Sequence, residues 1–160
     1  MTNFANHEIA AFFDARQAEL LDLSRRVPMT FAREFRINLP IEGGVYVFFF
    51  QSSVFYVGET TSIRQRIGMH MRNPENHVLA LKIARHLYDR SHGLGAAGSQ
   101  KKFSEQHKES TRQWIQEHLH VCYVPMLLGR KELEERLVCQ LNPEFNKRYP
   151  QLPTVASVAA

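Results

Sequence analysis

Two runs of β-branched and aromatic residues near the middle of the chain constrain its fold more than any other feature. They occupy residues 45–50 and 54–57, and the short polar segment Gln51-Ser52-Ser53 separates them. Runs of this composition joined by a brief polar connection are typical of a β-hairpin. The sequence therefore predicts an antiparallel pair of strands here.

The length of the connection decides which side chains share a face of this hairpin. A two-residue loop places Tyr46 and Tyr56 on opposite faces, whereas a three-residue loop places both tyrosines on one face. The register of the hairpin thus determines whether the two phenols can act together. For the three-residue loop, the opposed pairs are Phe50 and Val54, Phe48 and Tyr56, and Tyr46 and Gly58.

Helical spacing of apolar residues and breaks at proline and glycine predict the remaining elements. We expect helices at residues 8–25, 30–36, 62 to just before 74, 77–89, 109–117 and 130–141, and a third strand at 119–124. The expected fold is α/β of the α+β kind, with a small, mainly antiparallel three-stranded sheet that contains the hairpin and is flanked by helices. An N-terminal helical extension (1–40) precedes the main domain (41–147), with a flexible insertion at about 91–106 and an unordered tail (148–160).

Composition limits the class of protein. The 160 residues suffice for one ordinary domain. The two cysteines, Cys122 and Cys139, have neither disulfide-framework nor zinc spacing. The longest apolar run, 45–50, is too short to cross a membrane, and the N-terminus lacks a signal pattern, so we expect a cytoplasmic protein. A net charge of +4 and a pI near 9.3 fit a polyanionic partner.

One carboxylate on the last expected helix has an unusual position. A turn of about 100° per residue places Glu134 inside the apolar arc, whereas Glu132 and Glu135 point to the polar side. Desolvation of an unpaired charge costs several kcal/mol, so such a residue is usually paired, neutralised or bound to a metal. A buried salt bridge to a nearby arginine and a metal site are both consistent with this pattern. The arc consists of Leu133, Leu137, Val138 and Leu141.

The helix expected after the hairpin carries a second candidate pair. Arg66 and His70 are neighbours at i and i+4, along the edge of an apolar stripe. They are either a helix-surface pair or part of a site beside the hairpin. Arg64 and Arg72 lie outside this edge and are candidates for contact with a nucleic-acid backbone, as are Lys101 and Lys102 in the expected insertion.

The combination of these residues resembles the GIY-YIG nuclease superfamily. The resemblance covers residues 44–146, about two thirds of the chain, and it rests on the spacing of the whole set. The residues that carry it are Gly44-Val45-Tyr46, Tyr56-Val57-Gly58, Arg66, His70, Glu134 and, behind Pro143, Asn146.

The resemblance implies a DNA endonuclease that hydrolyses a phosphodiester with one Mg²⁺ (or Mn²⁺) ion held by Glu134. It implies that Arg66 neutralises charge on the phosphate, that Tyr46 is the general base, and that Tyr56 is a positioning group or an alternative base. His70 would relay a proton or contact phosphate. Asn146 would orient phosphate or fix the loop after the metal-binding helix.

Two features depart from the family pattern. Glu59 follows Gly58 where many members carry a small or basic residue, and the segment between Arg66 and Glu134 is longer than in compact members. The insertion could carry target recognition. The alternative function is a catalytically inactive nucleic-acid-binding module with the same fold. Cleavage of both DNA strands by a single-site nuclease needs either a homodimer or two successive binding events, and for a homodimer the N-terminal helices are the expected interface.

Overall fold

A computed structural model describes residues 2–92, 103–148 and 150–153 of the chain. Lys101, Lys102 and most of the expected insertion lie outside these residues. Within the described ranges, no helix is both long and apolar enough to cross a membrane.

A four-stranded antiparallel sheet forms the centre of the molecule. Its order is β1-β4-β2-β3, so β3 is an edge strand. The sequence predicted three of these strands, and β1 corrects that number. A two-residue strand is too short to show an alternating pattern, and β1 lies between the two helices expected in the N-terminal extension, where Val27 pairs with Val121. The strands are β1 (Val27–Pro28), β2 (Gly44–Phe50), β3 (Ser53–Thr60) and β4 (Leu119–Pro125).

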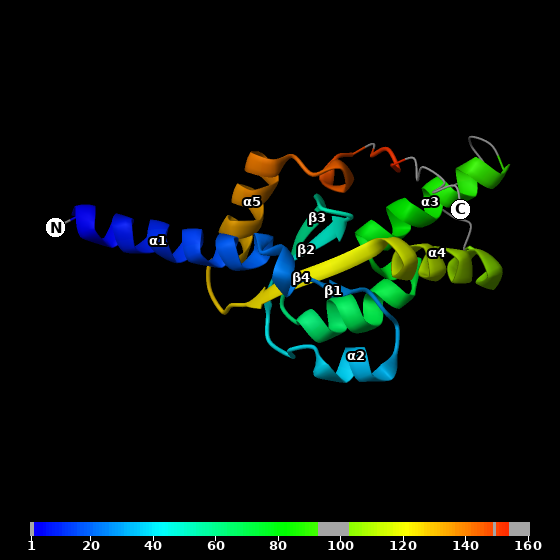
Figure 1. The fold of residues 1–160 in the computed structure, drawn as a ribbon, viewed down its shortest axis with the longest axis horizontal. Helices are drawn as coiled ribbons and strands as arrows, with labels where there is room; N and C mark the ends of the chain where they lie inside the picture. The colour runs from blue at the N-terminus through cyan, green and yellow to red at the C-terminus, as the bar shows by residue number, and fades with distance from the viewer. Residues whose placement is uncertain (1, 93–102, 149, 154–160) are drawn as a thin grey trace.

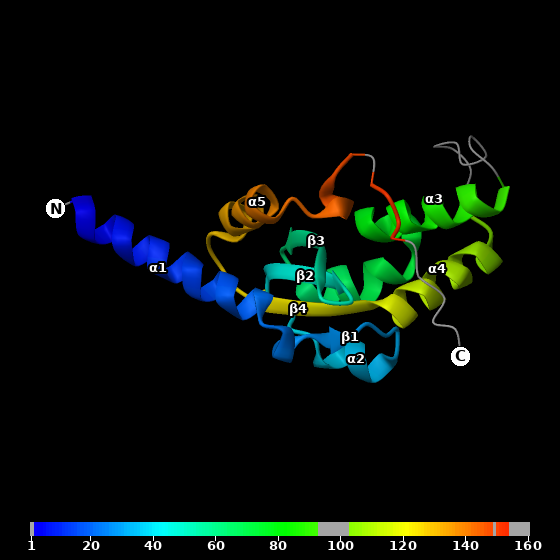
Figure 2. The ribbon, with the colours of Figure 1, turned by 45° about the horizontal axis from the view of Figure 1, so that its top comes forward.

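Helices cover both faces of the sheet. Figure 1 shows α1 extending away from one end of the body, whereas α3 and α4 pack together at the other end. Figure 2 shows α5 and α2 on opposite sides of the sheet. The described α-helices are α1 (Thr2–Leu21), α2 (Arg33–Asn38), α3 (Val78–His92), α4 (Glu105–His118) and α5 (Arg130–Leu141). The bounds of α5 are those that the sequence predicted.

Alternate residues of β2 divide between two hydrophobic cores, as the two-residue period of a strand requires. Tyr46 and Phe48 face the core that is closed by the segment after β3 and by α3. Val45, Val47 and Phe49 face the second core, beneath α1 and α5. The two tripeptide tyrosines therefore lie on the face opposite to the one on which α5 packs.

A β-bulge sets the register of the hairpin. Phe50 pairs with Ser53, and not with Val54 as a three-residue loop predicts, because the turn consists of Gln51 and Ser52 alone. Phe55 then has no opposite residue, and beyond it Phe48 pairs with Tyr56 as predicted. The extra residue in β3 returns Tyr56 to the face of Tyr46, whereas a two-residue loop without a bulge would place them on opposite faces.

The segment after β3 differs from the single helix that the sequence predicted. Residues Arg64–Met69 form a π-helical turn, in which the His70 amide donates to the Gln65 carbonyl, and short 3₁₀ turns follow at His70–Arg72 and Pro74–Asn76. Gly68 lowers the helical propensity of this segment. It also packs directly against α2, since a Cβ atom at Gly68 would lie 2.8 Å from Cγ of Arg36.

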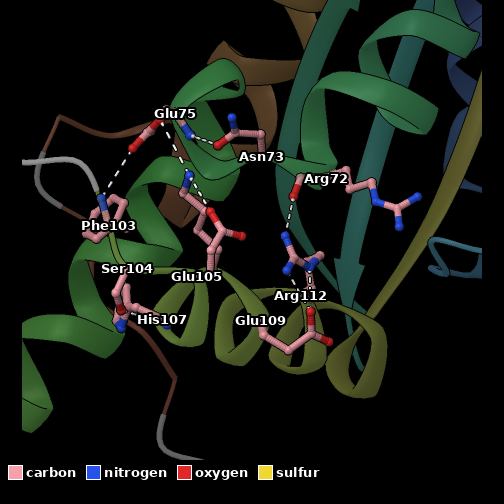
Figure 3. A network of polar contacts seen from close by, with 10 residues as sticks. Arg72, Asn73, Glu75, Phe103, Ser104, Glu105, His107, Glu109 and Arg112 are labelled. Atoms are coloured by element: carbon pink, nitrogen blue, oxygen red, sulfur yellow. Dashed lines mark hydrogen bonds and ion pairs between the residues drawn. The ribbon is translucent and has the colours of Figure 1, made fainter.

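Polar contacts tie α4 to the turns that follow this segment (Figure 3). The Glu75 carboxylate accepts a hydrogen bond from the Phe103 amide at 3.2 Å and lies 3.9 Å from Lys108 Nζ. Arg112 Nη1 donates to the Arg72 carbonyl at 3.1 Å. The expected insertion at 91–106 is therefore structured at both described ends, by the last turn of α3 and the first turn of α4.

The tail is also more ordered than expected, as far as it is described. Pro150 and Leu152 are buried, although the sequence predicted an unordered segment from residue 148. His86 Nε2 lies 2.6 Å from the Pro150 carbonyl, and the Gln151 amide donates to Glu144 at 3.0 Å. Sequence polarity alone does not reveal the first of these contacts, because it depends on α3 lying beside the tail.

Candidate active site

Tyr46 and Tyr56 lie side by side on one face of the hairpin. Their ring centroids are 6.3 Å apart, and Tyr46 is fully buried while Tyr56 retains 8% exposure. Gly58, directly opposite Tyr46, makes room for its ring, because a Cβ atom there would lie 2.5 Å from the Tyr46 hydroxyl. The glycine of the second tripeptide is thus required by the tyrosine of the first.

His77 is a component of this site that the sequence did not single out. Its Nε2 lies 3.3 Å from the Tyr46 hydroxyl, and its Nδ1 accepts a hydrogen bond from the Leu79 amide at 3.2 Å. Because Nδ1 is an acceptor, the ring proton is assigned to Nε2, which then donates to Tyr46. Burial, together with the nearby charges of Arg66 and His70, lowers the pKa of His77 to about 3. This imidazole is therefore neutral at physiological pH.

Arg66 reaches the same tyrosine from the π-helical turn. Its Nε donates to the Tyr46 hydroxyl at 3.4 Å. Burial raises the pKa of Tyr46 well above its ordinary value, the neighbouring Tyr56 adds to this effect, and the contacts with Arg66 oppose it. Burial also raises the pKa of Tyr56, while the Arg66 charge and a hydrogen bond from Tyr46 oppose that shift. The tyrosines and Arg66 thus form one coupled group.

His70 lies beside this group without a fixed partner. Its side chain is half-buried and, among the described residues, takes part in no hydrogen bond or ion pair. It is close enough to His77 to contribute to lowering the pKa of that residue. The predicted neighbours Arg66 and His70 are therefore both near the tyrosines, but only Arg66 contacts one of them.

Glu134 is a half-buried carboxylate on α5 that has no ion pair among the described residues. Burial raises its pKa above the ordinary value, the nearby Glu59 and Glu135 add to this, and Lys131 opposes it. Glu134 in turn raises the pKa of both Tyr46 and Tyr56. The carboxylate therefore lies near the tyrosines, although α5 packs on the other face, and the edge position of β3 permits this approach.

Both arginines of α5 pair with residues other than Glu134. Arg136 pairs with Asp14, and Arg130 Nε lies 3.3 Å from a carboxylate oxygen of Glu59, the residue that departs from the family pattern. Glu134 therefore does not form the salt bridge to a nearby arginine that was one of the two expectations.

An unpaired, partly desolvated carboxylate oxygen is the type of ligand that Mg²⁺ accepts. No group of three or more acidic, histidine or cysteine side chains that could hold a metal ion occurs within the described residues. A donor set this sparse suits an ion that keeps several water ligands, as Mg²⁺ commonly does. Glu134 thus fits a weakly ligated divalent cation and does not fit an ion that demands a full protein cage.

Asn146 joins the segment after α5 to the edge of the sheet. Its side-chain oxygen accepts from the Val57 amide at 2.8 Å, and its side-chain nitrogen donates to the Val57 carbonyl at 2.8 Å. Of the two roles implied for Asn146, this geometry matches fixing of the loop. Because Val57 lies between Tyr56 and Gly58, the contact also holds the second tripeptide in place.

The candidate nucleic-acid contacts divide into three cases. Arg64 donates from Nε to the Leu39 carbonyl at 2.9 Å and from Nη2 to the Ile37 carbonyl at 2.8 Å, so it caps the end of α2. Arg72 is exposed. Lys101 and Lys102 lie outside the described residues. Of the two described members of this set, Arg72 is therefore the one whose charge is available to a ligand.

A small antiparallel sheet that brings two tyrosines, an arginine and a half-buried carboxylate together defines a nuclease-type domain. The chain belongs to the GIY-YIG family, because the family described as the GIY-YIG catalytic domain matches residues 46–152.

Solved structures similar to this chain include the GIY-YIG N-terminal endonuclease domain of UvrC from Thermotoga maritima. The form bound to its catalytic divalent cation, magnesium, is 17% identical, with 72% of this chain and 94% of that chain covered and a TM-score of 0.40. A point mutant bound to its catalytic divalent cation has the same identity of 17% and the same coverage of 72% and 94%, with a TM-score of 0.39. No curated protein matches the chain.

Proposed function

We propose that this chain is a metal-dependent endonuclease that hydrolyses phosphodiester bonds in DNA. The observation that carries the proposal is Glu134, a half-buried carboxylate near both tyrosines that has no ion pair among the described residues. A binding module without activity has no need of a desolvated, unpaired charge in this place. The net charge of +4 and the exposed Arg72 support a polyanionic substrate.

Glu134 would hold one Mg²⁺ ion, with Mn²⁺ as a substitute. When bound, the cation would supply charge stabilisation at the phosphate and at the leaving 3′ oxygen. Arg66 would bind a non-bridging phosphate oxygen, since a planar guanidinium is a strong donor to developing negative charge. His70, whose side chain has no hydrogen bond or ion pair among the described residues, would make a further phosphate contact.

Tyr46 would act as the general base that accepts a proton from the attacking water, with Tyr56 as a positioning group or alternative base. Burial opposes a phenolate at Tyr46, but the N–H groups of Arg66 and His77 both donate to its oxygen and offset part of that penalty. Tyr56 is the more exposed phenol and accepts a hydrogen bond from Tyr46, so it would lie between Tyr46 and the substrate. Asn146 would hold this strand in position.

Purified protein incubated with supercoiled plasmid, linear duplex and branched DNA tests the proposal. We expect cleavage with Mg²⁺ and none with EDTA. Arg66→Ala should slow cleavage by about 10²–10³-fold, as loss of one charge-stabilising donor does in other enzymes. Glu134→Gln should abolish cleavage, whereas Glu132→Gln, which alters an exposed carboxylate on the same helix, should cleave like wild type. DNA binding without cleavage by the wild-type protein would instead identify an inactive binding module.

A second copy of the chain is the partner that we propose for α1. This helix extends beyond the body (Figure 1), and Ile9 and Phe12 are 55% and 46% exposed on it. Pairing through this apolar face would bring two single-metal sites to one duplex, which allows both strands to be cut in one binding event. Light scattering after gel filtration should give a dimer mass for wild type and a monomer mass for Ile9→Glu/Phe12→Glu. A wild-type monomer in the presence of DNA would contradict this assignment.

A further inference from the structure

One face of α5 presents two oppositely charged side chains toward β3. Arg130 and Glu134 are four residues apart on the helix, which places them on the same face one turn from each other. Arg130 Nε lies 3.3 Å from Oε2 of Glu59, the residue that follows Gly58 on β3. The Glu59 carboxylate therefore faces the part of α5 that also carries Glu134.

The link between Glu59 and Arg130 is weak. The two side chains are 36% and 25% exposed, and the pair has a single nitrogen–oxygen contact, without the two parallel hydrogen bonds of a strong arginine–carboxylate pair. Ion pairs as exposed as this one contribute little to stability. Arg130 also has a second partner, because its Nη1 donates to the Leu127 carbonyl at 3.0 Å. Arg130 can therefore stay in place when Glu59 leaves it.

Glu59 also acts on two residues of the candidate active site. After burial, its negative charge is the largest cause that raises the pKa of Glu134, and it contributes to raising the pKa of Arg66. A divalent cation bound near two carboxylates that repel each other stabilises the charged form of both, because its positive charge offsets the repulsion. Mg²⁺ is commonly held by one or two carboxylates together with water and substrate oxygens.

We propose that Glu59 is a second acidic residue of the divalent-cation site, which pairs with Arg130 in the cation-free protein and exchanges this partner for the cation bound at Glu134. The inference rests on the proposed function, since it adds a residue to the same site. It also gives the departure from the family pattern at Glu59 a role, in which the carboxylate strengthens the site and does not repel the substrate.

Mn²⁺ affinity of the full chain, measured without DNA from the electron paramagnetic resonance signal of free Mn²⁺, tests this proposal. We expect Glu134→Gln to abolish binding and Glu59→Gln to weaken it by about tenfold, as loss of a supporting ligand does in other metal sites. Arg130→Gln should tighten binding, because Glu59 is then released. Glu135→Gln is the matched control, since Glu135 also raises the pKa of Glu134 but is exposed and lies near Lys131, 4.0 Å away. Its removal should change the affinity less than about twofold.

The outcomes separate this inference from the proposed function. If Glu134→Gln loses Mn²⁺ while Glu59→Gln binds no more weakly than Glu135→Gln, only the role of Glu59 is overturned. Weaker binding by Arg130→Gln would also overturn it, because the ion pair would then support the site as a structural element. If Glu134→Gln binds like wild type, the assignment of the cation site itself fails. Damage to folding cannot explain tighter binding by Arg130→Gln, and thermal unfolding without Mn²⁺ checks the other variants.

Discussion

Nε2 of His77 lies 3.3 Å from the Tyr46 hydroxyl in a part of the core where both side chains are almost fully buried. The Leu79 amide occupies the other ring nitrogen, so His77 acts as a donor to the tyrosine. Arg66 donates to the same oxygen. The hydroxyl proton of Tyr46 must therefore point away from His77 and Arg66, toward Tyr56.

Replacement of His77 should shift the pH dependence of cleavage. His77→Phe keeps the ring volume but removes the donor, so the pKa of Tyr46 should rise and the increase of activity with pH should move to higher pH. Loss of a hydrogen bond to a charged group costs about 1.5–3 kcal/mol, so activity at neutral pH should fall about 10–100-fold. His77→Gln, which retains an N–H group, should recover part of this loss. A pH profile of His77→Phe that coincides with wild type would contradict the assigned donor.

Glu134→Gln should make the protein more stable in the absence of divalent cations. The pKa of Glu134 is raised in the folded state from its ordinary value of 4.5, so the folded protein holds this proton more tightly than the unfolded chain does. Stability from this group is therefore lost as pH rises from about 4.5 through the folded pKa. Thermal unfolding in EDTA should show a higher midpoint for Glu134→Gln at pH 7, and the difference should disappear below pH 4. A lower midpoint at pH 7 would indicate that the carboxylate has a stabilising partner.

Asn146→Ala should loosen the edge strand. The substitution leaves the Val57 amide and carbonyl without their partner, and unsatisfied backbone groups cost about 1–3 kcal/mol when water cannot replace the bond. Hydrogen exchange at Val57 should accelerate, and cleavage should fall because Tyr56 and Gly58 lose their support. Glu144→Ala alters a side chain two residues away that contacts Lys147 and Gln151, and it should leave this exchange rate unchanged. Unchanged protection of Val57 in Asn146→Ala would show that the two 2.8 Å contacts do not hold the strand.

Gly58→Ala should displace Tyr46. A Cβ atom at this position would lie 2.5 Å from the Tyr46 hydroxyl, which no relaxed contact permits. The ring must move away from Arg66 and His77, and overpacking of this kind typically costs about 1–3 kcal/mol in stability. Cleavage should be reduced at least as strongly as in Tyr46→Phe. In a Tyr46→Ala background, which lacks the clashing ring, Gly58→Ala should cost less stability than it does in the wild-type background, as thermal unfolding of the two single variants and the double variant would measure.

Local patterns predicted the elements that carry the site, and contacts between distant segments account for what they missed. The helical arc of α5 placed Glu134 inside an apolar face, where the structure has it half-buried, and the composition of residues 45–57 predicted the hairpin. The role of His77 depends on α3 lying over the tyrosine face, which no periodicity reveals. Asn146 and Arg64 were likewise identified as polar residues, but their partners, Val57 and the end of α2, follow only from tertiary packing.

The bulge at Phe55 determines which spacings between the two tripeptides place both tyrosines on one face of the hairpin. With a two-residue turn, Tyr46 and Tyr56 lie on the same face of the hairpin only because Phe55 has no pairing partner on β2. A relative with the same spacing between its tyrosines but without the bulge must have a three-residue turn, or else one phenol points away from the other. With the same two-residue turn and the same bulge, a spacing between the tyrosines that differs by two residues keeps both phenols on one face, whereas a spacing that differs by one places them on opposite faces. The bulge and the spacing of the two tripeptides must therefore change together if the pair is to be kept.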